Sequence, residues 1–105
     1  MSSFLEHCDA SRQKFGKNYA HVHTWLDEFF ARMGWNLKHR DIRHHLKGIE
    51  QVREMWGEEA AEAARLHIEM DFEGFIPRDE KEVQSWRMGV LRDFERESPR
   101  ALALG

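Results

Sequence analysis

Apolar side chains return every three or four residues along most of the chain, which is the spacing of an α-helix that packs on one side. The pattern predicts helices over residues 4–15, 19–33, 37–56, 58–70 and 80–95. Because the connections between them are short, we expect an all-α fold, a compact single-domain bundle of four to five helices. Residues 1–97 would form this helical domain and residues 98–105 a frayed C-terminal tail.

Short polar motifs mark the helix ends. Ser3 with Glu6 fits a capping box, and Asn18 and Asp79 can cap two later helices. Gly16 can take the left-handed conformation that ends a helix. These signals predict where three helices begin and where the first one ends.

Gly48 lies inside the third predicted helix, over residues 37–56. Glycine weakens a helix interior by about 1 kcal/mol relative to alanine. A close approach by another backbone, or by a ligand, would offset that cost. We therefore expect a group to pack tightly against this position.

The composition mainly excludes classes of protein. A chain of 105 residues with 41% hydrophobic residues suits one folded domain, and a formal net charge of -3 argues against a general nucleic-acid binder. No apolar run is long enough to cross a membrane, and residues 1–6 do not fit a secretory signal. Cys8 is the only cysteine and is expected to be buried, so no internal disulfide forms and a cytoplasmic location is the simplest expectation.

A basic decapeptide at residues 38–47 departs from this acidic average. Seven of its ten side chains are Lys, Arg or His. Imidazole is the commonest metal ligand in proteins, and the arginine guanidinium is suited to phosphate. The segment therefore indicates either a metal centre or an anion site.

Two copies of His-x-x-x-Asp are the second unusual pattern. His23 and Asp27 form one pair on the second helix, and His67 and Asp71 form the other at the end of the fourth. A spacing of four places both side chains of a pair on one helix face. Imidazole with carboxylate is a ligand set for Zn, Mn, Fe or Ni.

The helical projection separates the histidines of the third helix. With Ile42 at the centre of the buried face, His39 and His45 lie about 60° to either side and are expected to enter the bundle. His44 lies about 160° away, so we expect it to face solvent beside Arg40. Asp41 precedes His45 by four residues and could orient its ring.

Each pattern also has an ordinary explanation. One His-x-x-x-Asp pair is usually solvated or hydrogen-bonded within its helix, tryptophans are usually core residues, and a basic cluster is usually a solvated helix face. His7 and His21 are expected at the surface. The site hypotheses depend on several patterns that coincide on three helices.

Three stretches together resemble an uncharacterised family of small bacterial and phage proteins. They are Tyr19…His23-Thr-Trp-Leu-Asp27, His39-Arg40…Arg43-His44-His45…Gly48-Ile49 and Trp56-Gly57, followed by His67, Asp71, Pro77 and Trp86. The likeness covers about residues 8–86. The chain departs from the family pattern at Trp56, where the family has phenylalanine, and at Ala64-Arg65-Leu66, where the family is more polar. The resemblance indicates the same histidines and aspartates that the helical geometry indicates, but it implies no activity.

The first functional hypothesis is a metal-binding helical protein. Its ligands for one Zn, Mn, Fe or Ni ion would be His23, Asp27, His39, His45, His67 and Asp71. With an open coordination position, and Arg40 or Arg43 beside it, such a metal could hydrolyse a phosphoester. The histidine–aspartate phosphohydrolases, however, carry an adjacent His-Asp pair that this chain lacks.

The second hypothesis is a binding module without chemistry, which would hold a nucleotide or another small phosphorylated ligand. The phosphate would meet Arg40, Arg43, His44 and Lys47, and Trp35 or Trp56 would stack on a base. Such a module is expected to be a homo-oligomer with the pocket between subunits. A third hypothesis is a structural adaptor that associates with itself through the alanine-rich stretch of residues 60–64.

Overall fold

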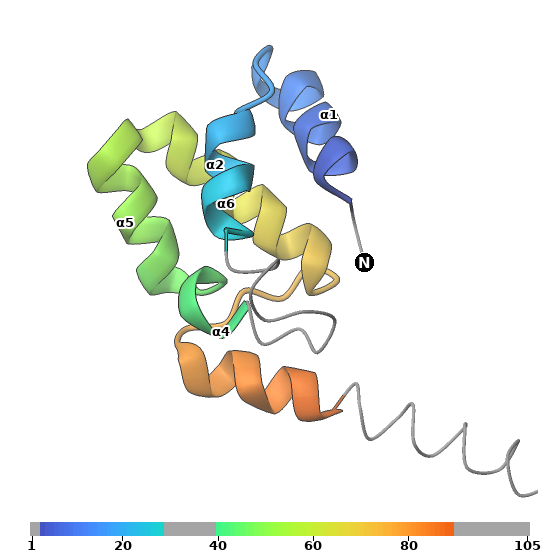
Figure 1. The fold of residues 1–105 in the computed structure, drawn as a ribbon, viewed down its shortest axis with the longest axis vertical. Helices are drawn as coiled ribbons and strands as arrows, with labels where there is room; N and C mark the ends of the chain where they lie inside the picture. Colours follow the sequence, from blue (N-terminus) through green and yellow to red (C-terminus); the bar gives the residue numbers. More distant parts are fainter. Residues whose placement is uncertain (1–2, 29–39, 90–105) are drawn as a thin grey trace, which may run out of the picture.

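The computed structural model describes residues 3–28 and 40–89, and this part of the chain forms an all-α, single-domain fold without strands (Figure 1). The helices, labelled as in Figure 1, are α1 (Phe4–Phe15), α2 (Ala20–Leu26), α4 (Arg40–Arg43), α5 (Leu46–Trp56) and α6 (Glu58–Asp71), followed by a helix over residues 80–89. None of the described helices is long and apolar enough to span a bilayer.

Helix α6 is the centre of the bundle. Figure 1 shows α1, α2 and α5 arranged around it, and all three helices contact it. The side of α6 that they cover carries small side chains, which allow helices to approach closely. Its alanines are at most 1% exposed, namely Ala60, Ala61, Ala63 and Ala64. The self-association surface proposed for residues 60–64 is therefore wrong, because the chain's own helices cover it.

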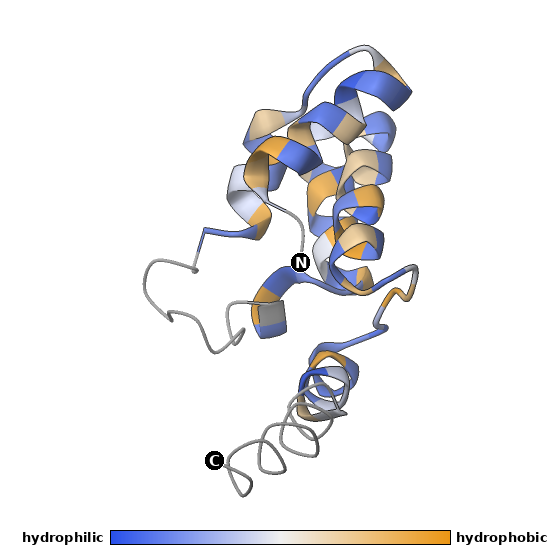
Figure 2. Ribbon diagram, turned by 90° about the vertical axis from the view of Figure 1, so that its right-hand side faces the viewer, coloured by the Kyte–Doolittle hydropathy of each residue, from blue (hydrophilic) through white to orange (hydrophobic). Residues whose placement is uncertain are grey.

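The hydrophobic core lies between α2, α5, α6 and the helix over residues 80–89. Val22 and Leu26 from α2 meet Ile49 and Val52 from α5, and all four are at most 1% exposed. Figure 2 shows hydrophobic and hydrophilic residues alternating along each helix, as one-sided packing requires. Burying such side chains supplies the main favourable free energy of folding.

Most of the predicted helix ends are confirmed. Ser3 and Glu6 exchange both capping-box hydrogen bonds, at 3.1 and 3.2 Å. Gly16 ends α1 in the left-handed conformation with φ of 78°. Asp79 accepts a hydrogen bond from the Glu82 N–H at 3.0 Å, which caps the helix over residues 80–89.

The start of α2 differs slightly from the prediction. The side chain of Asn18 accepts a hydrogen bond from the Ala20 N–H at 3.1 Å, as a capping residue would. The residue next to the helix, however, is Tyr19, in the left-handed conformation with φ of 50°. The helix is also shorter than predicted, since it ends at Leu26, and the predicted extension over residues 29–33 lies outside the described residues.

The prediction of one continuous helix over residues 37–56 is wrong in its first half. Helix α4 ends at Arg43, and α5 begins at Leu46 after His45, whose backbone is extended with φ of -156° and ψ of 179°. The break has a structural partner, because the Leu46 N–H donates a hydrogen bond to the carbonyl of Pro77 at 3.0 Å. A carbonyl group from a loop far away in the sequence therefore accepts a hydrogen bond from the first N–H group of α5.

Gly48 makes this break sterically feasible. A Cβ atom at this position would lie 1.8 Å from the carbonyl oxygen of Arg43. The predicted close approach is therefore confirmed, and the approaching group is the chain's own backbone just before the break. Any larger residue at position 48 would push α4 away from α5.

The break also changes which apolar residues are buried. Ile49 and Val52 of the predicted stripe lie in the core, but Ile42, Leu46 and Trp56 are 38–40% exposed. A projection that assumes one helical phase across residues 42–56 fails, because the phase is reset at residues 44–45.

Candidate metal centre

Four side chains from three separate segments bring one atom each to a common point. His44 lies at the α4–α5 break, His67 and Asp71 lie on α6, and Asp27 directly follows α2. The His44 Nε2 atom lies 3.3 Å from Asp27 Oδ1 and 3.2 Å from Asp71 Oδ2. The His67 Nε2 atom lies 3.4 Å and 3.2 Å from the same two oxygens, and the two Nε2 atoms are 3.2 Å apart.

These five distances match five of the six edges of a coordination tetrahedron. Four N and O ligands at about 2.0–2.1 Å from Zn²⁺ stand about 3.3–3.4 Å from one another. Octahedral ligands at a similar bond length stand only about 3.0 Å apart. The four residues, each of which offers one atom within 4.8 Å of the others, are therefore positioned to hold one metal ion.

Ordinary hydrogen bonding explains this arrangement less well. In a network of two-centre hydrogen bonds, each N–H group donates to one acceptor, and a donor lies between each pair of heavy atoms. Here both imidazole nitrogens approach both carboxylate oxygens, and they also approach each other at 3.2 Å. One cation at the centre would satisfy all four atoms together.

The four side chains are largely buried, so their charges must be balanced within the site. The side chains of His44 and His67 are 0% exposed, that of Asp71 is 3% exposed, and that of Asp27 is 29% exposed. Burial alone would raise the carboxyl pKa values, but the hydrogen bonds from His44 and His67 outweigh it and hold the pKa values of Asp27 and Asp71 below their ordinary range. Two ionised carboxylates therefore need a positive charge beside them.

Without a metal, His67 can supply that charge. Burial disfavours its imidazolium form, but the carboxylates of Asp27 and Asp71 reverse this, so the pKa of His67 lies above its ordinary value. A divalent metal would replace this proton and balance both carboxylates, leaving the buried site neutral.

His23 and Ser11 support His67 from behind. The Nδ1 atoms of His23 and His67 are 2.9 Å apart, and the His23 Nε2 atom lies 2.7 Å from Ser11 Oγ. If His67 binds a metal through Nε2, its Nδ1–H donates to His23 Nδ1, and the His23 Nε2–H then donates to Ser11. Burial and the neighbouring His67 and His7 lower the pKa of His23 to about 3, which keeps His23 neutral and able to accept. Such outer hydrogen bonds fix the orientation of a metal-binding imidazole.

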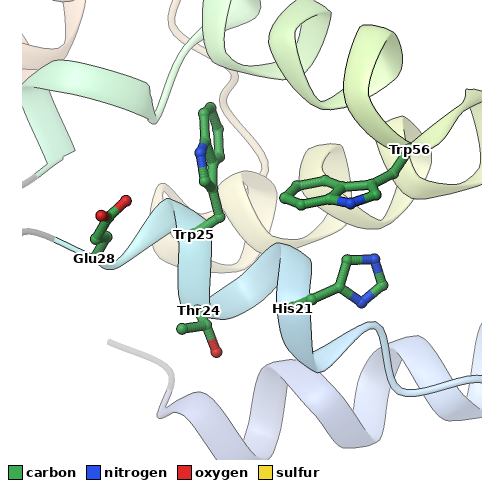
Figure 3. Close-up of a pocket in the computed structure, with 5 residues that line it drawn as sticks. All are labelled: His21, Thr24, Trp25, Glu28 and Trp56. Atoms are coloured by element: carbon green, nitrogen blue, oxygen red, sulfur yellow. The ribbon is translucent and has the colours of Figure 1, made fainter.

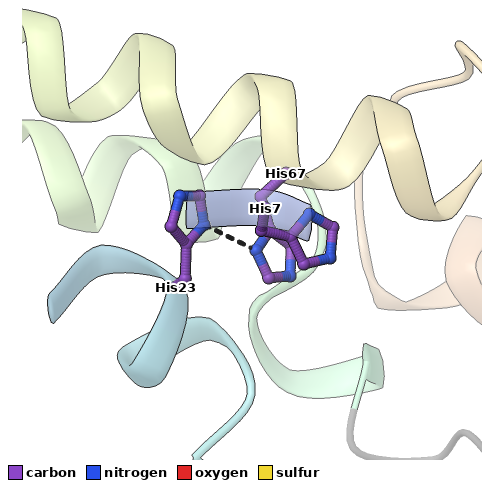
Figure 4. Close-up of side chains that lie close together, drawn as sticks. All are labelled: His7, His23 and His67. Atoms are coloured by element: carbon purple, nitrogen blue, oxygen red, sulfur yellow. Dashed lines mark hydrogen bonds between the residues drawn. The ribbon is translucent and has the colours of Figure 1, made fainter. Parts of the chain in front are cut away.

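His7 supports the opposite side of the group. Its ring stacks on that of His67, with centroids 3.7 Å apart (Figure 4). Its Nε2 atom lies 3.2 Å from Asp71 Oδ1. The nitrogens of His7, His23 and His67 also lie within 4.8 Å of one another. The three rings are nearly parallel, however, with interplanar angles of 17–19°. Since a nitrogen lone pair lies in its ring plane, parallel rings do not point at one ion, and we interpret His7 and His23 as supports of the first group.

The structure brings four of the six predicted metal ligands together. Asp27, His67 and Asp71 belong to the tetrahedral group, and His23 lies directly behind His67. His45 is buried but is not in the group, because its Nε2 atom donates to the backbone carbonyl of Asp41 at 3.2 Å.

The remaining members of the predicted set are placed as follows. Residue His39 lies outside the described residues. The carboxylate of Asp41, which was expected to orient His45, instead pairs with Arg87 at 2.6 Å. The His45 ring is therefore oriented by the backbone carbonyl of Asp41 and not by its carboxylate.

Two residues of the site were misplaced by sequence reasoning. His44 was expected in solvent and is fully buried, because the helix break turns it inward. His7 was expected at the surface and is 1% exposed. A signal for His7 was present, since His7, Cys8 and Ser11 share the buried face of α1 at helical spacing.

The basic residues do not form a common anion pocket in the described part of the chain. The Arg43 guanidinium donates to the backbone carbonyl of Trp25 at 2.7 Å, pairs with Glu28, and lies 4.0 Å over the Trp25 ring. Lys47 is exposed, whereas His44 is buried. The side chain of Arg40 lies outside the described part. Arg43 thus has a structural role at the end of α2.

The tryptophan predicted to stack on a base lies at a separate surface. Trp56 is 40% exposed and lines a shallow pocket of about 400 Å³ between α2 and α5 (Figure 3). The pocket is lined by His21, Thr24, Trp25, Glu28 and Trp56. None of the four converging residues lines it, and Trp35, the other predicted stacking residue, lies outside the described residues.

Comparison with known proteins adds a family but no activity. A search of curated proteins and a search of solved structures each found no significant match. The family model described as a domain of unknown function, DUF6915, matches residues 2–88, and the chain belongs to this family.

Proposed function

We propose that this protein binds one divalent transition metal through His44, His67, Asp27 and Asp71. The observation that carries the proposal is the tetrahedral spacing of 3.2–3.4 Å among atoms from three segments of the chain. Nitrogen and carboxylate ligands at this spacing suit Zn²⁺ best, with Mn²⁺, Fe²⁺ and Ni²⁺ as weaker candidates.

Such a metal would join segments that are distant in the sequence. It would tie the end of α2 and the α4–α5 break to α6, which is the central helix. Because the metal binds the folded chain and not the unfolded one, it would stabilise the protein by mass action. The supporting contacts of His23 and His7 suit a site built for an ion, since they orient His67 and Asp71.

Metal-assisted hydrolysis of a phosphoester is a second candidate function for the same site. A catalytic metal needs a coordination position that water or substrate can reach. The 29% exposure of the Asp27 side chain supports such access. Arg43 is already engaged in contacts at the end of α2. We therefore expect a small phosphorylated ligand to bind the metal and not the basic segment.

Metal binding is tested with tag-free protein that has been stripped with a chelator and titrated separately with Zn²⁺, Mn²⁺, Fe²⁺ and Ni²⁺ by calorimetry. We expect one ion per chain, and a loss of affinity greater than about 100-fold in His44→Ala and His67→Ala, since even supporting residues are worth 10–100-fold. Two control variants, His21→Ala and His45→Ala, lie outside the group and should keep the ion. Circular dichroism of each variant checks that the helices remain.

Two results would overturn the proposal. One is wild-type protein that takes up none of the four metals at micromolar concentration. The other is wild-type binding that His44→Ala and His67→Ala both leave unchanged, because the ion would then lie elsewhere.

A further inference from the structure

The four candidate ligands differ in their access to solvent. The side chains of His44, His67 and Asp71 are at most 3% exposed, whereas that of Asp27 is 29% exposed. Asp27 follows α2, a helix of only seven residues, and has φ of -99° and ψ of 12°. Solvent therefore reaches the group from the side of Asp27.

Asp71 is held in a different way. Its Oδ2 atom faces both imidazoles, and its Oδ1 atom lies 3.2 Å from His7 Nε2. It also ends α6, the 14-residue helix at the centre of the bundle. Both carboxylate oxygens of Asp71 thus lie close to nitrogen atoms of buried histidines.

We propose that Asp27 is the exchangeable ligand of the metal, and that its position accepts a water molecule or a small oxyanion, such as a carboxylate or phosphate group. This inference rests on the proposed function, since it needs a metal at the site. In the exchange, the bond between the metal and the Asp27 oxygen breaks and a bond to the incoming oxygen forms, with no change of oxidation state. His44, His67 and Asp71 keep the ion in place throughout.

The charge of the site favours an anion at this position. A divalent ion with neutral His44, neutral His67 and two carboxylates has no net charge, and removing the carboxylate of Asp27 leaves one positive charge. That charge would face the exposed side of the site, where an anion can enter. Removing the carboxylate of Asp71 would leave the same charge on the side that is closed to solvent.

The test uses cobalt as a visible probe, because Co²⁺ in a tetrahedral site absorbs strongly in the visible range. Wild type, Asp27→Ala and Asp71→Ala are loaded with Co²⁺ and titrated separately with acetate, inorganic phosphate and chloride. We expect Asp27→Ala to retain one Co²⁺ and to show a saturable spectral change with acetate or phosphate, and Asp71→Ala to lose the ion. Acetate and phosphate arms distinguish a carboxylate ligand from a phosphate ligand, and Glu28→Ala, a neighbouring exposed carboxylate, should behave as wild type.

The outcomes separate this inference from the proposed function. Wild type that binds no Co²⁺ contradicts metal binding itself. Wild type that binds Co²⁺, with an Asp27→Ala variant that loses the ion or shows no response to either oxyanion, overturns only the exchangeable position. If Asp27→Ala does not fold, Asp27→Asn removes the charge with nearly the same shape and is held to the same outcomes.

Discussion

Replacement of Gly48 by alanine tests the helix break that turns His44 into the site. Helix propensity alone predicts that Gly48→Ala stabilises the protein by about 1 kcal/mol. The structure predicts the opposite sign, because the new Cβ would lie 1.8 Å from the Arg43 carbonyl oxygen. Separating these two atoms requires a backbone shift of more than about 1 Å, and overpacking of this kind costs about 1–3 kcal/mol.

The assay is urea denaturation of the metal-free protein, followed by Zn²⁺ calorimetry on the same samples. We expect a loss of about 1–3 kcal/mol in the free energy of unfolding, together with weaker Zn²⁺ binding, because His44 lies inside the shifted segment. Gly89→Ala is the matched control: a Cβ there meets nothing within 4 Å, so it should be neutral or stabilising. A Gly48→Ala protein as stable as wild type, with unchanged Zn²⁺ affinity, would refute the close approach and with it the break.

Further predictions concern the site, its surroundings and the oligomeric state. His23→Ala should weaken metal binding by about 10–100-fold in calorimetry, since it removes the partner of His67 Nδ1; an unchanged affinity would contradict this supporting role. Metal affinity should rise with pH through the raised pKa of His67, because the ion replaces a proton, and calorimetry in buffers of different ionisation enthalpy should detect its release. In the metal-free protein the same raised pKa contributes stability at low pH that is lost as pH rises through it, so the two trends should oppose each other. Arg43→Ala should lower the free energy of unfolding by about 1–3 kcal/mol, through loss of the hydrogen bond to the Trp25 carbonyl, while metal stoichiometry stays at that of wild type. The homo-oligomer expected from the sequence stays a prediction, which light scattering on the metal-loaded protein tests; a monomer at all concentrations would contradict it.

The sequence by itself determined the features that depend on neighbouring residues. The capping box of Ser3 and Glu6 and the left-handed Gly16 are local structures, so their motifs located the ends of α1. The pairing of His67 with Asp71 is also local, because a spacing of four within one helix fixes their relative position. These interactions made the all-α fold and part of the candidate metal centre predictable.

Only the tertiary structure decided which side chain of the His44–His45 pair joins the candidate ligand group. The answer depends on where the third predicted helix breaks, and the break is stabilised by the distant carbonyl of Pro77 and permitted by Gly48. A helical projection assumes a single phase, so it placed His45 correctly in the interior but placed His44, which is also buried, in solvent. Contacts between segments, which no local pattern encodes, therefore selected His44 as the fourth candidate ligand.

The burial of His7 illustrates the same division. Its helix is predictable, but its surroundings depend on how α1 packs on α6. A histidine in a helix can face solvent or the core at similar intrinsic propensity, since propensity measures only the local backbone. The sequence thus determined the helices and the i, i+4 pairs, whereas packing between helices determined which imidazoles and carboxylates meet, because burial and charge balance are properties of the assembled bundle.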